Sequence, residues 1–215
     1  MARTAATIGI LWLAGAAAAG QSAPARTFND VRTGDLPAGF ELATTRQDGP
    51  GTWLVRRTGS DGWLVHEGDP AAMGFALALA PDAPLRDVRV SVRLRLAGGA
   101  RAGGLVWRYL GPADYYAAIL DLGRHEIVLY RMAAGNRIFL ESEDGLELDA
   151  AAWHTLRVVH DEARIDVSLG GIRVFNERDR RYDRSTGPGR TGVIASGASE
   201  AWFDDLRIEA DRDRR

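Results

Sequence analysis

Residues 87–96 read Asp-Val-Arg-Val-Ser-Val-Arg-Leu-Arg-Leu, a strict alternation of polar and apolar side chains. Successive side chains of a β-strand point to opposite faces of a sheet, so a period of two gathers the apolar residues on one face. That face would hold Val88, Val90, Val92, Leu94 and Leu96, and the other face Arg89, Ser91, Arg93 and Arg95. The pattern predicts a half-buried strand, with one face on a core and the other in water.

Shorter runs of the same kind follow along the chain. We expect strands at residues 63–67, 105–109, 115–121, 126–131, 137–141, 153–159, 164–169, 172–175, 191–195 and 201–208. Gly170-Gly171 lies between two of these runs and predicts a tight hairpin turn of a primed type. No segment of the mature chain combines a helical period with capping residues. The sequence therefore predicts an all-β fold, an antiparallel two-sheet jelly-roll sandwich.

The amino-acid composition of the chain excludes several classes of function. The chain has 215 residues, 46% hydrophobic and 26% charged, with a net charge of −2, which suits one globular domain and disfavours a general nucleic-acid binder. It contains no cysteine, which excludes disulfides, thiol catalysis and cysteine–zinc sites. It also contains no lysine, which excludes Schiff-base chemistry and a phosphate-binding P-loop lysine.

The two ends of the chain differ in character from its middle. Residues 1–19 carry Arg3, then an apolar run, then Ala17-Ala18-Ala19, which predicts a secretory signal peptide with cleavage there or as late as residue 25. The alternative is an N-terminal anchor helix, but the apolar run is short for a bilayer span. We expect a single jelly-roll domain over 26–209, a charged tail over 210–215, no membrane span after cleavage, and a periplasmic or extracellular location.

Residues with catalytic chemistry are sparse. The paired carboxylates that most glycoside hydrolases need have no standard motif here. The candidates for a catalytic acid or base are Asp121, Glu141 and His154, and the sequence leaves open whether the chain is an enzyme. No histidine pair has the helical spacing of a zinc site.

Two further groups of residues permit two interpretations each. Asp204-Asp205 could bind calcium through oxygen ligands, or could sit at a β-bulge between Phe203 and Leu206 and cap backbone amides. The arginines on strand faces could contact sugar hydroxyls, or could form ordinary cross-strand ion pairs with acidic neighbours. We expect most of the strand tryptophans to be core residues; these are Trp53, Trp63, Trp107, Trp153 and Trp202.

Three stretches suggest a family: Gly-Gly-Leu-Val-Trp-Arg-Tyr at 103–109, Asp-Tyr-Tyr at 114–116 and Trp-His-Thr-Leu-Arg-Val at 153–158. They resemble the laminin-G-like and concanavalin A-like jelly rolls of exported bacterial proteins, closest to the 3-keto-disaccharide hydrolase-like domains and their levan-binding relatives. The resemblance implies two antiparallel sheets with a ligand on the concave sheet or at its rim. It also implies that Arg108 and Tyr116 contact that ligand. Simple alternation places Arg108 on the face opposite Trp107.

Three functions follow as hypotheses. The first is an exported domain that binds carbohydrate, with Arg108 donating to sugar hydroxyls or a carboxylate and Tyr116 stacking on or orienting the ring. The second is a glycoside hydrolase of the 3-keto-disaccharide type. The third is a structural or protein-interaction domain of the cell envelope with no small ligand. We expect a monomer that partners a glycan and no nucleic acid, and we expect no cofactor, with calcium the one ion to be tested.

Overall fold

The computed structural model describes residues 23–45, 49–98, 101–181 and 187–211, and within these ranges it contains strands and no helix. The strands are β1 (Glu41–Thr44), β2 (Thr52–Thr58), β3 (Asp61–Glu67), β4 (Phe75–Leu79), β5 (Val88–Gly98), β6 (Ala102–Gly111), β7 (Asp114–Asp121), β8 (Glu126–Ala133), β9 (Asn136–Asp144), β10 (His154–Asp161), β11 (Arg164–Leu169), β12 (Ile172–Arg178), β13 (Arg190–Ser196) and β14 (Ser199–Ala210). The all-β prediction is confirmed.

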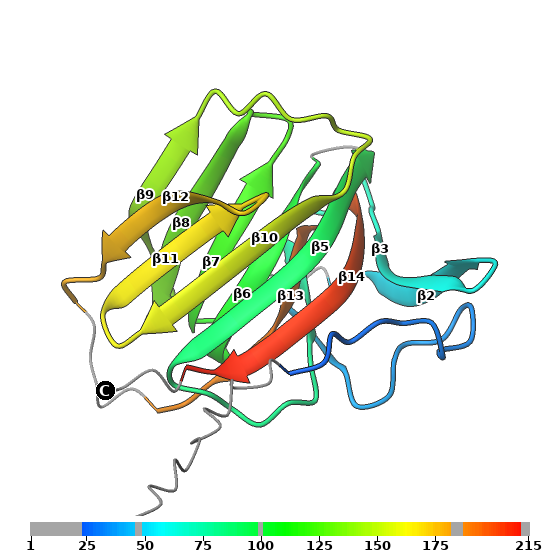
Figure 1. The fold of residues 1–215 in the computed structure, drawn as a ribbon, viewed down its shortest axis with the longest axis horizontal. Coiled ribbons are helices and arrows are strands. Elements are labelled where there is room, and N and C mark those ends of the chain that lie inside the picture. The colour runs from blue at the N-terminus through cyan, green and yellow to red at the C-terminus, as the bar shows by residue number, and fades with distance from the viewer. Residues whose placement is uncertain (1–22, 46–48, 99–100, 182–186, 212–215) are drawn as a thin grey trace, which may run out of the picture.

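The strands form two seven-stranded antiparallel sheets that pack face to face as a jelly-roll sandwich (Figure 1). The β5 sheet has the order β12-β11-β10-β5-β14-β3-β2, and the β6 sheet has the order β1-β4-β13-β6-β7-β8-β9. Neighbours such as β4 and β13, or β5 and β14, are far apart in sequence, so the sheets close only after most of the chain is made. The antiparallel two-sheet architecture is the predicted one.

Strand β5 lies at the centre of its sheet, between β10 and β14 (Figure 1). Its five alternating apolar residues are all buried at 0–1% exposure, as the period of two predicts. They share one core with inward residues of the β6 sheet such as Leu105, Trp107 and Leu120. Burial of a side chain of this size contributes about 1.5–3 kcal/mol, so this interface is the main source of stability.

Two local features of the backbone also agree with the sequence. Gly170 and Gly171 form the turn between β11 and β12, with φ angles of 59° and 83°, which is the left-handed pair that a tight hairpin of this type requires. The pairing of β14 with β5 shifts between Asp204 and Arg207, and Asp205 has a φ angle of 50°. The predicted bulge between Phe203 and Leu206 is therefore present.

The expectation for the tryptophans is wrong for three of the five. Trp53 and Trp107 are core residues. Trp63, Trp153 and Trp202 are half-buried and pack against one another on the outer face of the β5 sheet. The register explains this, because Trp202 pairs with Arg95 and so shares the outward face of that arginine.

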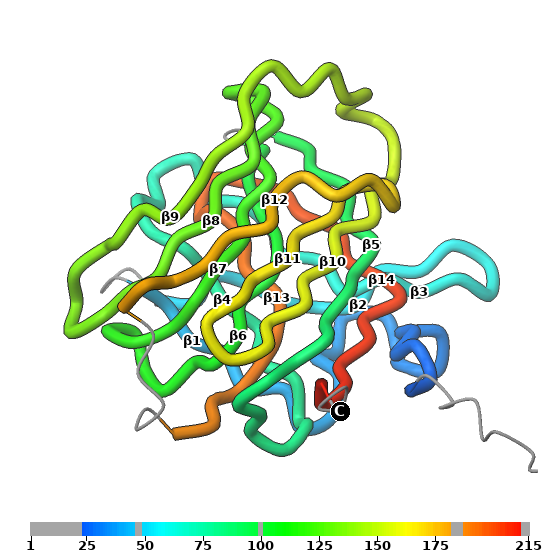
Figure 2. The backbone as a smooth tube through the Cα atoms, turned by 60° about the vertical axis from the view of Figure 1, so that its left-hand side comes forward, coloured from blue at the N-terminus to red at the C-terminus, as the bar shows by residue number. Residues whose placement is uncertain are grey.

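The N-terminal part of the described chain is tied to the C-terminal strand. Arg26 and Leu206 exchange backbone hydrogen bonds of 2.7 and 3.1 Å, and Figure 2 shows the blue N-terminal segment beside the red β14. Residues 1–19, the predicted signal peptide, and most of the predicted tail lie outside the described residues. Asp211 is described, and its carboxylate pairs with Arg89 at 2.9 Å. Within the described ranges no helix is long and apolar enough to cross a membrane.

The close approach of β6 and β7 at Gly104 can be tested by substitution. A Cβ atom at Gly104 would overlap the carbonyl oxygen of Ala118 on β7, whereas a Cβ at Gly111 in the same strand would meet nothing within 4 Å. We expect Gly104→Ala to destabilise the fold by about 2–3 kcal/mol, because the backbone must shift to admit the methyl group. Gly111→Ala is the matched control. Urea denaturation of both variants checks this, and equal stabilities would contradict the packing described.

Candidate functional site

The candidate site is built around a bulge in β6. Pairing between β6 and β7 is regular up to Trp107 and then shifts, with Gly111 opposite Asp114. Arg108 begins the shift and has a φ angle of 48°, in the left-handed region that few residues other than glycine adopt. The strict alternation predicted for this strand is therefore wrong at Arg108. Its guanidinium carbon lies 5.6 Å from the ring centroid of Tyr116, a core residue between the sheets, and Arg108 is only 2% exposed.

Tyr116 is held in place by a buried carboxylate. Its hydroxyl donates to Oδ2 of Asp179 at 2.7 Å, and Nη1 of Arg131 donates to the same oxygen at 2.9 Å. The backbone N–H of Arg181 donates to the other oxygen of Asp179 at 2.9 Å. Burial raises the pKa of Asp179, but the hydrogen bonds from Tyr116 and Arg131 outweigh it, so the pKa lies below its usual range. Burial and the bond to Asp179 raise the pKa of Tyr116, which stays protonated.

Two guanidinium groups contact the Tyr116 ring. The Arg131 guanidinium carbon lies 5.7 Å from the ring centroid, a distance close to that of Arg108. Beside them is a hollow of about 30 Å³, which we call the Arg108 hollow. It is lined by Arg108, Leu110, Asp114, Tyr115, Tyr116, Arg131 and Met132. Its volume is close to the space of one water molecule, so it can admit one polar group of a ligand rather than a whole sugar ring.

A second buried hydrogen bond involves Trp107, the residue before Arg108. Nε1 of Trp107 donates to Nδ1 of His160 at 2.8 Å, so Nδ1 is the acceptor and the imidazole proton is on Nε2. His160 is fully buried, and burial, followed by the positive charge of Arg108, lowers the pKa of His160 to about 4. The ring is neutral at pH 7. His160 has no signature in the sequence, because a lone histidine on a strand resembles any other.

The three candidate catalytic residues are not brought together. Asp121 ends β7 and accepts hydrogen bonds from the backbone N–H groups of Gly123 and Arg124, at 2.9 and 3.0 Å. Glu141 lies on β9, opposite the core residue Leu129. His154 begins β10 in the other sheet and bonds the carbonyl oxygen of Asp149 at 2.9 Å. A general acid and base must face one substrate, and these side chains belong to different sheets or different faces.

The Asp204-Asp205 pair has the features of the bulge interpretation. Oδ1 of Asp204 accepts the backbone N–H of Asp205 at 2.8 Å, which is the amide cap expected at a bulge. Arg93 lies 3.2 Å from Asp205 and 3.8 Å from Asp204, so an arginine supplies the positive charge beside both carboxylates. Within the described ranges no group of three or more histidine, aspartate or glutamate side chains could hold a metal ion.

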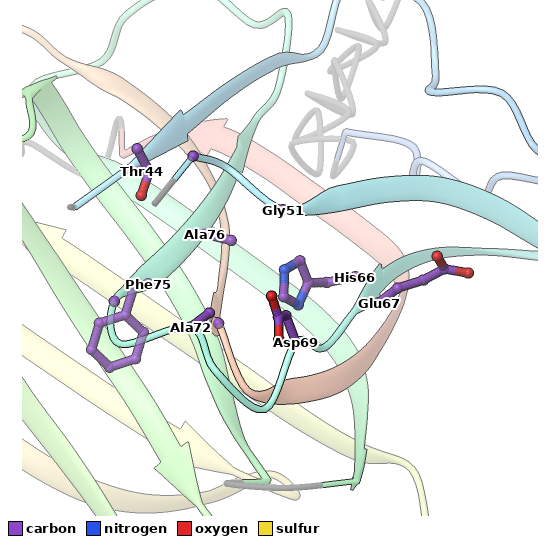
Figure 3. A pocket seen from close by; sticks show the side chains of 11 residues that line it. Thr44, Gly51, His66, Glu67, Asp69, Ala72, Phe75 and Ala76 are labelled. Carbon is purple, nitrogen blue, oxygen red and sulfur yellow. The ribbon is translucent and has the colours of Figure 1, made fainter. Parts of the chain in front are cut away.

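A separate pocket of about 50 Å³ lies where the chain crosses from β1 to β2 (Figure 3). His66 lines it; its Nδ1 donates to the carbonyl oxygen of Ser199 at 2.9 Å, and Nε2 has no hydrogen-bond partner. Burial lowers the pKa of His66, so Nε2 is an unprotonated acceptor. Gly51, with a φ angle of 69°, passes so close that a Cβ there would overlap Nε2. Asp69 lies beside the ring, but its Oδ1 caps the Ala71 N–H.

Sequence reasoning missed two residues of the Arg108 hollow and its support. Arg131 lies in an alternating run, yet nothing there distinguishes it from other strand arginines. Asp179 is 63 positions away from Tyr116 and sits in a stretch rich in arginine and aspartate, so only the fold reveals the contact. Arg108 and Tyr116 both line the Arg108 hollow.

Comparisons with known proteins agree on the fold. No protein-family model and no curated protein sequence matches the chain. Among solved structures it is similar to the carbohydrate-binding module CBM66 of Bacillus subtilis, with 18% identity and a TM-score of 0.59 over 79% of this chain and 95% of that one. It is also similar to domain 4 of AbnA, a GH43 extracellular arabinanase of Geobacillus stearothermophilus in complex with arabinotriose, with 14% identity and a TM-score of 0.57. That match covers 87% of this chain and 91% of that domain.

A third structure comes from work on endo-acting O-glycanases of the human gut microbiota that initiate mucin breakdown. It matches with 13% identity and a TM-score of 0.60, over 88% of this chain and 99% of that one. At identities this low, the likeness shows a shared jelly-roll architecture. The comparisons therefore agree with the two-sheet jelly-roll fold of this chain.

The neutral, buried His160 makes the fold sensitive to acid. The pKa of His160 is about 4 when folded against about 6.5 when unfolded, so stability falls as the pH drops from about 6.5 to 4, by about 3 kcal/mol from this group. His160→Asn keeps an acceptor for Trp107 and removes the titration. We expect urea denaturation to show a smaller loss of stability over this range for the variant, with His66 supplying the remainder. An unchanged loss would contradict a neutral His160.

Proposed function

We propose that this chain is an exported, monomeric carbohydrate-binding domain whose ligand enters at the Arg108 hollow. The observation that carries the proposal is the convergence of two guanidinium groups, Arg108 and Arg131, beside an opening where β6 and β8 end and β7 begins. Guanidinium groups present several N–H donors in a fixed plane, which suits pairs of sugar hydroxyls or a carboxylate. The similarity to a carbohydrate-binding module and to an arabinotriose-bound domain supports the same ligand class.

The structure changes the role we assign to Tyr116. The ring is 5% exposed, and guanidinium groups lie over it, so it does not offer an open face to a sugar. We assign it a supporting role in place of stacking on or orienting the sugar ring: it positions both arginines while its hydroxyl anchors Asp179. Leu110, which is 49% exposed at the rim, supplies the apolar contact that a sugar ring needs.

Two observations favour binding over the other hypotheses. Asp121, Glu141 and His154 do not face one substrate, so these three candidates do not form the acid and base of a hydrolase of the 3-keto-disaccharide type. An envelope interaction domain should show a broad exposed apolar patch. In the part of the chain that the structure describes, the large apolar side chains that are exposed lie on separate elements; they are Met73, Leu110, Phe139 and Ile172. We keep the 3-keto-disaccharide hydrolase-like family as the proposed sequence relationship, without its activity.

The test is a glycan array carrying fructans, arabinans, uronates and 3-keto sugars, with product analysis of each hit. Arg108→Lys keeps the positive charge but loses the planar donor pair, so we expect the affinity for the best glycan to fall about ten-fold or more. Arg124→Lys, on an exposed turn, is the matched control and should bind as the wild type does. Near-UV circular dichroism checks that both variants fold.

The outcomes separate the three functions. Binding without product formation, lost in Arg108→Lys and kept in Arg124→Lys, supports the proposal. Binding with turnover would move the chain to the hydrolase class and direct mutagenesis to its carboxylates. Equal affinities for the two variants would place the site elsewhere, and no binding to any glycan would favour the interaction domain.

A further inference from the structure

The outer face of the β5 sheet carries a row of charged residues that are not part of the Arg108 hollow. Arg157 on β10, Ser91 on β5 and Arg207 on β14 are in direct register across three adjacent strands. Figure 1 shows these strands side by side, with β5 between the other two. Neighbouring strands lie about 4.8 Å apart, so the two arginines start about 10 Å apart with a short serine between them.

A hollow of about 180 Å³ lies over this row, and we call it the Ser91 hollow. It is lined by Arg89, Val90, Ser91, Arg157, Arg207 and Glu209. Arg89 pairs with Asp211 at 2.9 Å, and Glu209 accepts the backbone N–H of Ala23 at 2.7 Å. The volume equals the liquid share of about six water molecules, which is enough for a charged substituent together with part of a sugar ring.

Arg157 and Arg207 differ from four arginines of this sheet face that pair with carboxylates. Arg93 pairs with Asp204 and Asp205, Arg56 with Glu67 and Glu200, and Arg164 and Arg173 both pair with Asp166. Within the ranges that the structure describes, neither Arg157 nor Arg207 forms an ion pair. Two cations that flank one hollow, and that form no ion pair with the carboxylate of Glu209 in its lining, favour an anionic ligand there.

An aromatic strip continues the face along β5. Arg95 lies four residues beyond Ser91, about 13 Å along the strand. Its guanidinium carbon is 4.5 Å from the ring centroid of Trp202 and 5.7 Å from that of Trp153, so the three side chains stack. Both indoles are half-buried. The stacked side chains hold one another in place and leave the indole rings partly exposed. They lie farther along β5 on the same face as the Ser91 hollow.

We propose that this strip is a second glycan-binding surface, and that its ligand is a polyuronate, a polysaccharide with one carboxylate on each sugar. One carboxylate lies over Ser91 and accepts hydrogen bonds from Arg157 and Arg207, because the planar guanidinium fork matches a carboxylate. The chain then follows β5 toward Trp153 and Trp202. The surface shares no residue with the Arg108 hollow, so it stands or falls independently of the proposed function.

Charge spacing favours a polyuronate over nucleic acid. Carboxylates of Glu67, Glu200 and Asp204 are interleaved with the arginines of this strip, and the chain carries a net charge of −2. A nucleic acid presents a phosphate at every nucleotide and would meet these carboxylates at many points. A polymer with one charge per sugar can place its carboxylates at the open arginines and its neutral ring atoms elsewhere.

The experiment is titration calorimetry of the full chain with polygalacturonate, neutral dextran, dextran sulfate and single-stranded DNA. We expect polygalacturonate to bind and neutral dextran not to bind. The double variant Arg157→Gln/Arg207→Gln should weaken polygalacturonate binding about ten-fold or more. The matched control, Arg164→Gln/Arg173→Gln, removes the same charge from the same sheet and should stay within about two-fold of the wild type. Arg108→Lys is titrated beside them to report on the Arg108 hollow.

Five results would overturn the inference. If the wild-type protein does not bind polygalacturonate, the proposed ligand is wrong. Equal loss in the two double variants shows that net charge, not the Ser91 hollow, controls binding. If dextran sulfate binds as tightly as polygalacturonate and loses affinity in the same Arg157/Arg207 variant, the surface does not recognise carboxylates specifically. If DNA binds more tightly than polygalacturonate, the proposed polymer class is wrong. Loss in Arg108→Lys alone would reassign the polyuronate to the Arg108 hollow, which tests the proposed function separately.

Discussion

The candidate site depends on two of the buried hydrogen bonds that cross the sandwich. One runs from Trp107 on β6 to His160 on β10, and the other from Tyr116 on β7 to Asp179 at the end of β12. A buried polar group without a partner costs about 1–3 kcal/mol, so these bonds fix which residues face each other where the sheets meet. The chain has neither disulfides nor helices in the described ranges, so packing and these polar bridges hold the sheets in register.

The left-handed conformation of Arg108 places its guanidinium group beside the residues that these hydrogen bonds hold, and this creates the candidate binding site. In a regular strand, Arg108 would point away from the core, on the face opposite Trp107. The bulge instead places its guanidinium over Tyr116, where Asp179 fixes the tyrosine and Arg131 contacts the same ring. Backbone strain of this kind persists only where the surroundings determine it. The same contacts that orient the arginines thus keep them beside the opening.

The sequence predicts regular strands well and contacts between distant residues poorly. The period of two in β5, the paired glycines of the β11–β12 turn and the bulge near Asp205 are all readable, because each follows from local geometry. Strand β4 reads as a short apolar run with no alternation, since residues on both of its faces are buried. The left-handed Arg108 has no sequence signature, and Asp179 meets Tyr116 only because the sheets stack. The outward tryptophans were misassigned because tryptophan is usually a core residue.

The most direct test of the central claim is to locate a bound oligosaccharide by NMR, without altering the protein. Titration of labelled protein with the best array glycan should shift the backbone amides of Arg108, Leu110, Asp114 and Met132, together with the Trp107 indole N–H. Those signals come from the rim and the support of the Arg108 hollow. Saturable shifts confined to these residues are the predicted result. Shifts centred on any other surface, with these signals unmoved, would contradict the account.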